Sequence, residues 1–341
     1  MGNKKPTVQL KDPWKKLLEK SLHIKITKSE PINAGMNNQL FKLVDSLGKK
    51  YFLKKYFKDK KNRLWREFHA IKVMNENGFT NIPQAYFQNP KHQIALYSFE
   101  KGQTRTAKDV NRKEILAMAK FLADLNKINL NKMSVDFPPA VLACLNLKRY
   151  IHNIDFRINE FIEYLNDSHS LIKQKLRNIN IKKIIEQLKS DALSGLSNSD
   201  IDKDLPEYRR QLCPIDYGPH NILVDSKGNI CFIDFEYFGV DDPARVITDF
   251  ILHDRSIAIS DQLKHTFKNH YLGLVNASDE IIDHINRVEK LVAIEWLAIY
   301  LYSLMPIKIK NRKFSDDSFD ENKYINQQLK RFLTRLETFN L

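Results

Sequence analysis

The chain has 341 residues, a formal net charge of +14 and 43% hydrophobic residues. This composition excludes a disordered chain and is typical of a globular protein with a sizeable core. No apolar run approaches the roughly 18 residues that a membrane span needs. The first ten residues, MGNKKPTVQL, lack the apolar stretch of a secretory signal. We therefore expect no membrane span.

The three cysteines, Cys144, Cys213 and Cys231, are few and widely spaced. No Cys/His cluster suggests a metal site of that kind, and a reduced, cytoplasmic setting is expected. The basic residues are spread along the chain instead of gathering in one arm, which argues against a dedicated nucleic-acid binder. Their excess indicates either an ordinary solvated surface or an attraction toward anions. No feature of the sequence indicates an oligomeric state.

The N-terminal third is dominated by strand patterns. Alternating apolar residues on both sides of Gly48 predict a hairpin over 39–57, and the helical spacing of apolar residues predicts a helix over 62–78 that ends at Gly78. Another strand is expected within 92–102. The sequence thus predicts a strand-rich first domain over residues 1–100.

After Gly102 the pattern becomes helical. Helices are expected over 113–128, as a pair within 150–190, and from Ala244 to the end, with a loop over 194–206. Two short apolar runs, NILVD and NICFIDF, predict a second hairpin over 221–235. Residues 101–341 are therefore predicted to form a larger, mostly helical domain, with a cleft between the two domains near residues 98–103.

Polar side chains gather around the second predicted hairpin. Asp216 and Asn221 stand at its mouth, and Asp234 and Glu236 follow its second strand. Carboxylate and amide oxygens suit magnesium, which bridges phosphate oxygens, and phosphoryl transfer also needs a carboxylate to orient the incoming hydroxyl. The alternative is an ordinary acidic turn.

This segment resembles the catalytic and metal-binding loops of the aminoglycoside phosphotransferase/choline kinase superfamily. The family pattern H-x-D-x-x-x-x-N followed by I-D-[FW]-[DE] reads here as Pro214 to Asn221 and then Ile233 to Glu236. The string from Asp234 to Tyr237 resembles the choline/ethanolamine kinase branch. The run FGVDDPARVITDF resembles members encoded near surface-polysaccharide genes.

The resemblance implies an α+β, bilobal, protein-kinase-like fold with a β-rich N-lobe and a mostly helical C-lobe. It also implies a small-molecule kinase that uses ATP or GTP and Mg²⁺. Asp216 would be the base, while Asn221 and Asp234 would hold the metal. Glu236 would reach a second metal ion or shape the same site. Pro214 replaces the family's loop-supporting histidine, which puts the geometry of this loop in question.

The nucleotide side of the site is expected from the first domain. Gly35 and Asn38 match a phosphate-covering loop, and the aromatic-Leu-Lys pattern favours Lys54 over Lys55 as the strand lysine. Glu67 resembles the helix glutamate that pairs with that lysine. The alternatives are a solvated lysine on an edge strand and a surface carboxylate. The predicted hinge residues are Ser98, Phe99 and Glu100.

Four residues are candidates for binding the acceptor: Asp249, Glu295, Trp296 and Tyr300. Aromatic faces and carboxylates suit a cation such as choline, whereas the same helical spacing is also that of an ordinary core. The acceptor is predicted to be a sugar or polysaccharide precursor, an amino alcohol or an aminoglycoside, and the basic balance favours an anionic one. An impaired pseudokinase that binds nucleotide is the alternative, favoured by Pro214. A protein kinase fits less well because the chain has D-F-E for D-F-G and no A-P-E segment.

Overall fold

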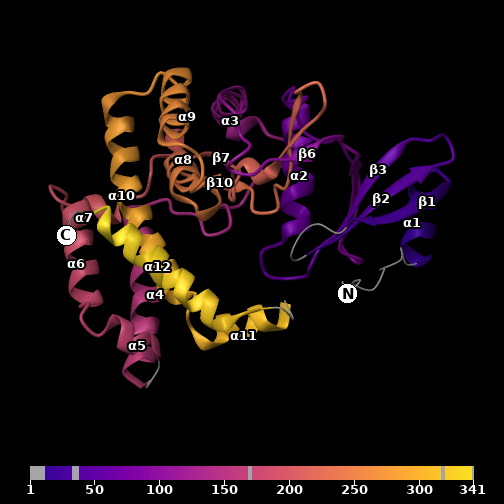
Figure 1. The fold of residues 1–341 in the computed structure, drawn as a ribbon. Coiled ribbons are helices and arrows are strands. Elements are labelled where there is room, and N and C mark those ends of the chain that lie inside the picture. The colour runs from indigo at the N-terminus through magenta and orange to yellow at the C-terminus, as the bar shows by residue number, and fades with distance from the viewer. Residues whose placement is uncertain (1–11, 33–37, 168–170, 316–318, 340–341) are drawn as a thin grey trace. The chain divides into compact units, whose positions relative to one another are not determined.

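The computed structural model describes residues 12–32, 38–167, 171–315 and 319–339 (Figure 1). The chain forms two compact units. The first comprises residues 1–143, 211–246 and 255–276, and the second comprises residues 144–210, 247–254 and 277–341. In the described part of the chain, no helix is long and apolar enough to cross a membrane.

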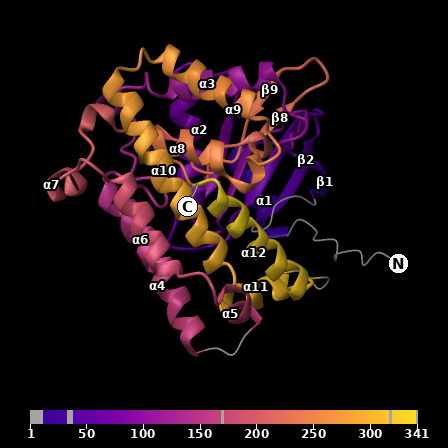
Figure 2. The same cartoon turned by 60° about the vertical axis from the view of Figure 1, so that its left-hand side comes forward.

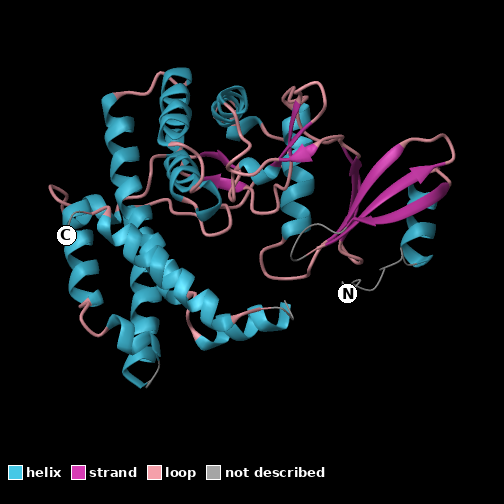
Figure 3. Ribbon diagram, viewed as in Figure 1, coloured by secondary structure: helices cyan, strands magenta, loops and turns pink. Residues whose placement is uncertain are grey.

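An antiparallel sheet of five strands forms the N-terminal part of the first unit (Figure 3). The predicted hairpin over 39–57 is confirmed, and its second strand is the central one. Lys54 in this strand lies opposite Leu40 on one neighbour and Ala95 on the other, so it does not belong to an edge strand. In spatial order the strands are β1 (Ile26–Ile32), β2 (Gln39–Asp45), β3 (Lys50–Lys55), β5 (Ile94–Ser98) and β4 (Ala85–Asn89).

Two helices accompany this sheet because side chains alternate along β3. Tyr51 and Leu53 join the buried cluster that includes Trp14 from α1 (Asp12–Leu22). Lys54 instead contacts Glu67 from α2 (Arg63–Glu76). The helix predicted over 62–78 is confirmed, and Gly78 follows it with a φ of 82°. Helix α1 was not predicted, since charged residues outnumber the apolar ones that form its buried stripe.

The segment after β5 pairs with the predicted second hairpin. Strand β6 (Gln103–Thr104) pairs with β8 (Ile222–Val224), which pairs with β9 (Ile230–Phe232). Gly102 precedes β6 with a φ of 142°, and a Cβ there would lie 2.9 Å from the carbonyl carbon of Val224. Only glycine therefore allows this close pairing. Strands β7 (Gln211–Cys213) and β10 (Gly239–Asp241) form a further pair that flanks the hairpin in sequence.

Helices make up most of the remaining chain, as predicted. In the first unit, α3 (Arg112–Leu125) packs against α9 (Asp261–Leu274), and Phe121 of α3 stacks on Phe232 of β9 with ring centroids 4.0 Å apart. Helix α8 (Pro243–Leu252) runs from the first unit into the second. The described residues also form 3-10 turns at Leu130–Lys132, Glu207–Arg209, Pro219–Asn221 and Asp254–Ser256.

The second unit is helical, and α10 packs against α4 and α12 within it (Figure 2). The pair of helices expected within 150–190 is in fact three helices, and the expected loop over 194–206 contains a short helix with a capping box at Ser197. The helices are α4 (Leu147–Asp167), α5 (Leu171–Leu176), α6 (Ile181–Ala192), α7 (Asn198–Asp202), α10 (Asp279–Tyr302), α11 (Pro306–Ser315) and α12 (Glu321–Glu337).

We predict that Gly102→Ala destabilises the protein by about 2–3 kcal/mol, because it adds a steric clash with β8 to an unfavourable backbone conformation. Gly48→Ala is the matched control. Gly48 also has a positive φ, 79°, but nothing lies within 4 Å of its added Cβ. Urea denaturation of the two variants should show the larger loss for Gly102. Equal losses would contradict the role of the close β6–β8 pairing.

Candidate active site

The loop after β7 holds Asp216 and Asn221 in a fixed relation. Asp216 has a φ of 64°, and the side-chain Nδ2 of Asn221 donates a hydrogen bond to the backbone oxygen of Asp216 at 2.9 Å. The backbone oxygen of Asn221 accepts from the N–H of Ile233 at 3.0 Å. These bonds connect the Asp216 loop to the segment that carries Asp234.

The segment after β9 also contains an unusual backbone conformation. Asp234 has a φ of 67°, which is uncommon for a residue with a side chain. Phe235 and Phe238 on either side of Glu236 are buried, and Arg66 of α2 donates to the backbone oxygen of Phe238 at 2.8 Å. Left-handed backbone at Asp216 and at Asp234 is the kind of strain that gathers at functional sites, where the surrounding structure holds it.

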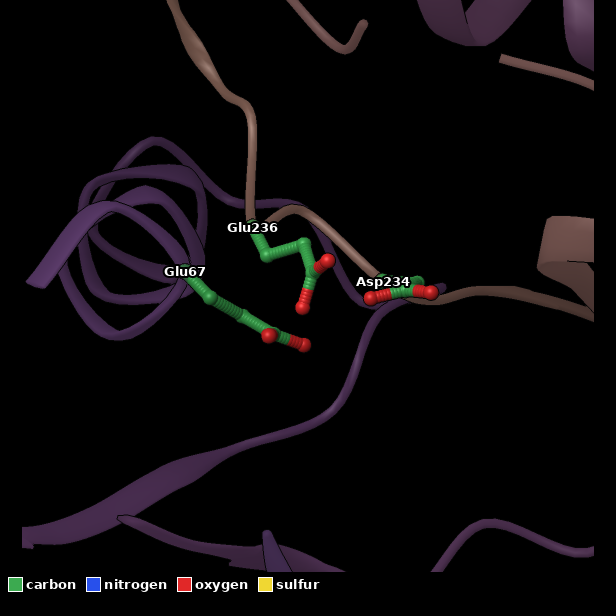
Figure 4. A group of neighbouring side chains, drawn as sticks. All are labelled: Glu67, Asp234 and Glu236. Atoms are coloured by element: carbon green, nitrogen blue, oxygen red, sulfur yellow. The ribbon is translucent and has the colours of Figure 1, made fainter. Parts of the chain in front are cut away.

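Lys54 is the centre of the charged cluster. Its Nζ lies 2.7 Å from Glu67 Oε2, 2.6 Å from Asp234 Oδ1 and 3.4 Å from Glu236 Oε2. Figure 4 shows that Glu67 extends from α2, while Asp234 and Glu236 belong to the segment after β9. One ammonium group therefore connects the sheet, the helix and this segment.

Glu236 has further partners of its own. Its Oε1 accepts a hydrogen bond from Arg63 at the start of α2, and its Oε2 accepts from Asn38 Nδ2 at 2.8 Å. The Asn38 side-chain oxygen also accepts from the backbone N–H of Phe57 at 3.2 Å. Asn38 thus reaches the carboxylate cluster, whereas its predicted companion Gly35 lies outside the described residues.

Two buried tyrosines complete the surroundings of Glu67. Tyr56 donates to Glu67 Oε2 at 2.8 Å, and its hydroxyl oxygen lies 2.8 Å from that of Tyr97. Burial raises the pKa of Glu67 to about 7 although Lys54 opposes the rise. Burial lowers the pKa of Lys54, but Asp234, Glu67 and Glu236 outweigh it and raise the pKa well above its ordinary value. One shared lysine stays charged among three carboxylates, yet it cannot offset the burial of Glu67.

The net charge of this cluster favours the binding of a further cation. Lys54 and Arg63 face the carboxylates of Glu67, Asp234, Glu236 and Asp59, so these groups carry an excess of negative charge when all are ionised. One oxygen each of Glu67, Asp234 and Glu236 lies within 4.8 Å of the others. Asn221 donates through its nitrogen, which leaves its amide oxygen as the end that suits a metal. An all-oxygen donor set of this kind fits Mg²⁺.

The predicted hinge residues follow the last strand of the sheet. Ser98 ends β5, where its N–H donates to the backbone oxygen of Gln84 at 2.9 Å and its Oγ donates to Glu100. Phe99 lies beneath the ammonium of Lys42, with 5.2 Å between Nζ and the ring centroid. The structure therefore places these residues at the end of β5, and their part in nucleotide binding stays a prediction.

The four acceptor candidates lie in the second unit. Trp296 Nε1 donates to Asp249 Oδ1 at 3.2 Å, and the Tyr300 hydroxyl donates to Asp254 Oδ1 at 2.6 Å. Glu295 accepts from Arg157 at 3.0 Å. Three of the candidates, on α10, are buried, and only Asp249 on α8 is partly exposed. The structure thus brings Asp249 and Trp296 together within the helical unit.

Sequence reasoning missed Arg63, Tyr56 and His220. Arg63 and Tyr56 contact the predicted glutamates, and His220 Nε2 lies 3.1 Å from Asp216 Oδ1. Two of these residues could have been identified from their positions in the sequence. His220 is the residue before Asn221, inside the family motif, and Tyr56 shares a strand face with Lys54. Arg63 gave no such signal, because an arginine at the start of a helix is ordinarily solvated.

Comparison with known proteins places this geometry in a family. The model of the phosphotransferase enzyme family matches residues 28–277, which include every member of the charged cluster. No curated protein sequence is significantly similar to the chain.

Several solved structures share the fold. A spectinomycin phosphotransferase bound to ADP and spectinomycin is 15% identical, with a TM-score of 0.63 and 95% of each chain covered. A choline kinase from Streptococcus pneumoniae is 16% identical, with a TM-score of 0.56 over 96% of this chain and 98% of that one. A Plasmodium vivax ethanolamine kinase is 20% identical, with a TM-score of 0.55 over 96% and 83%. The predicted kinase-like α+β fold and the predicted superfamily are confirmed.

We predict that Lys54→Met destabilises the protein in a pH-dependent way. The pKa of Glu67 is about 7 in the folded protein and 4.5 for an ordinary glutamate. The contribution of Glu67 to the free energy of unfolding is therefore fully present below pH 4.5 and is lost as the pH rises through the folded pKa. Without Lys54 the pKa of Glu67 rises further. The substitution should therefore lower the free energy of unfolding by about 3–5 kcal/mol near pH 8 and by less near pH 5. Urea denaturation at both pH values measures this, with Lys50→Met, on the exposed end of β3, as the control.

An equal loss at both pH values would show that the stability lost with Lys54 comes from packing and not from the ionised carboxylates.

Proposed function

Because the chain belongs to the phosphotransferase enzyme family, we propose that it transfers the γ-phosphoryl group of ATP to a hydroxyl group of a small molecule. The observation that carries the proposal is the convergence of Lys54, Asp216 and Asp234 from separate chain segments within one compact unit. An ordinary acidic turn would need no buried lysine bonded to Asp234.

In the proposed reaction the acceptor hydroxyl oxygen bonds to the γ-phosphorus while the bond to the β,γ-bridging oxygen breaks and ADP leaves. Asp216 orients the hydroxyl and takes its proton. Lys54, held by Glu67, contacts the nucleotide phosphates. Asn221 and Asp234, together with Glu236, would hold magnesium, which when bound neutralises phosphate charge. Gly35 and Asn38 would cover the phosphates.

The remaining parts of the proposal concern the chain's organisation and setting. The nucleotide would bind beside the hinge residues Ser98, Phe99 and Glu100, where the lobe over residues 1–100 meets the lobe over 101–341. A cytoplasmic location is proposed because ATP is available there and because Cys144, Cys213 and Cys231 are free thiols.

The acceptor class is inferred from the charges around Tyr237, which follows Glu236 in the chain. Lys61 Nζ lies 4.7 Å and Arg63 Cζ 5.0 Å from the ring centroid of Tyr237. Burial raises the pKa of Tyr237, Arg63 lowers it, and Glu236, Asp216 and Asp234 raise it further, which places this ring in the field of the catalytic carboxylates. Arg63 is paired with Asp59 and Glu236, so the charge of Lys61 at this ring is the one that favours a neutral or anionic acceptor, such as a sugar or polysaccharide precursor, over an amino alcohol or a polycationic aminoglycoside.

Acceptor residues are also proposed in the helical unit. Asp249 is the best placed of Asp249, Glu295, Trp296 and Tyr300, because it is the one that is partly exposed. Trp296, whose Nε1 donates to Asp249 Oδ1, would hold that carboxylate in place.

A pseudokinase that binds nucleotide without transferring phosphate is the second candidate. Pro214 favours it, since proline at this position removes both a side-chain and a backbone donor from the catalytic loop. The retained Asp216, Asn221 and Asp234 oppose it.

Two substitutions separate the chemistry from metal and nucleotide binding. ATP with Mg²⁺ should raise the melting temperature of the protein. At a hundredfold excess of ligand over Kd, the free energy of unfolding should rise by about 3 kcal/mol. Asp216→Asn should keep this shift but lower transfer by about 10³-fold or more. Asp234→Ala should remove the part of the shift that depends on Mg²⁺.

Differential scanning fluorimetry with and without Mg²⁺, and ADP release with a panel of hydroxyl compounds, provide the two measurements. A normal transfer rate in Asp216→Asn would show that the base is elsewhere. If ATP with Mg²⁺ raises the melting temperature of the wild-type protein but no ADP forms with any hydroxyl compound or with water, the protein is a pseudokinase.

The acceptor prediction is tested with matched compounds. Glucose 6-phosphate should give a higher kcat/KM than glucose, and choline should give the lowest. Lys61→Gln should reduce the advantage of the phosphorylated sugar by about 3- to 5-fold, because the cation beside Tyr237 is lost. Lys60→Gln, an exposed lysine in the same loop, is the control and should change little. Faster reaction with choline than with both sugars would contradict the assignment.

A further inference from the structure

The proposed base has a histidine neighbour within its own loop. His220 Nε2 lies 3.1 Å from Asp216 Oδ1, and both side chains are partly buried, with 20% and 34% of their surface exposed. An ionised carboxylate only accepts hydrogen bonds, so at this distance the proton of the bond is on Nε2. The imidazole thus donates directly to the group proposed to receive the acceptor's proton.

The loop is built to admit this ring. A Cβ at Gly218 would lie 2.8 Å from Cε1 and 2.9 Å from Nδ1 of His220. The φ of Gly218 is −176°, an extended conformation that any residue adopts, so the backbone does not require glycine there. The absence of a side chain at residue 218 is therefore explained by the space that the His220 imidazole occupies.

The other side of the loop offers no equivalent donor at residue 214. Pro214, two residues before Asp216, has neither a side-chain donor nor a backbone N–H. Asn221 Nδ2 donates to the backbone oxygen of Asp216. The bond from His220 is made to the carboxylate itself and restrains its rotation.

We propose that His220 is a positioning residue that orients the Asp216 carboxylate toward the acceptor hydroxyl. A carboxylate has about four lone-pair sites, so one bond to Oδ1 fixes its orientation and leaves capacity for the substrate proton. His220, which follows Asp216 in the chain, thus supplies the hydrogen-bond donor that Pro214 lacks. The inference rests on the proposed function of Asp216 as the base.

The test compares three variants in the full chain, with Mg²⁺–ATP and water as the reactants, so that no acceptor need be known. His220→Ala should lower kcat for ATP hydrolysis by about 10-fold while leaving KM for ATP unchanged. His220→Gln, whose amide nitrogen can take the place of Nε2, should recover most of this loss. Gly218→Ala, which keeps the histidine but displaces its ring, should lower kcat as His220→Ala does.

A role in folding alone would give a different pattern. Loss of melting temperature in proportion to kcat, or an equal kcat in the Gln and Ala variants of His220, would overturn the inference. If Asp216→Asn abolishes hydrolysis while His220→Ala has no effect, the inference fails and the proposed function stands. If the wild-type protein neither binds nor hydrolyses ATP, the proposed function fails and the inference fails with it.

The contact itself has a readout that does not depend on activity. In ¹⁵N spectra of histidine-labelled protein, the His220 Nε2 resonance should be that of a protonated nitrogen and should shift in Asp216→Asn. A resonance unaffected by that substitution would show that the two side chains are not bonded, whatever the activity.

Discussion

The sharing of one buried ammonium group among three carboxylates is the interaction on which the site depends. Lys54 bonds Glu67 of α2 and Asp234 of the segment after β9, and it lies close to Glu236. Glu67 is buried and could not stay ionised beside two other carboxylates without a cation. The lysine therefore connects the sheet, the helix and the segment after β9 within the first unit.

The neighbours of this cluster restrain its side chains but do not neutralise it. Tyr56 donates to Glu67, and Arg63 and Asn38 bond both oxygens of Glu236. The carboxylates around Lys54 and Arg63 outnumber these two cations, so an excess of negative charge is left at the proposed metal site. The same network keeps α2 in contact with the segment after β9, because Arg66 also bonds the backbone there.

Patterns that repeat along the chain predicted most of the fold. Alternation identified the hairpin that contains Lys54, helical spacing and Gly78 identified α2, and two apolar runs identified the hairpin beside Asp216. Errors arose where packing between elements overrides local composition. Helix α1 has more charged than apolar residues and a narrow buried stripe, and α7 is one short turn stabilised by a capping box.

The sequence by itself determined the family and predicted the chemistry, because the spacing of Asp216, Asn221 and Asp234 and the aromatic-Leu-Lys pattern are local features of the chain. Only the tertiary structure decided which groups surround them. The bonds from Arg63 and Asn38 to Glu236 join residues more than 170 positions apart, a separation that no local pattern encodes. His220 was close in sequence, yet its role depended on the turn that brings the ring back to Asp216 and on the space left by Gly218.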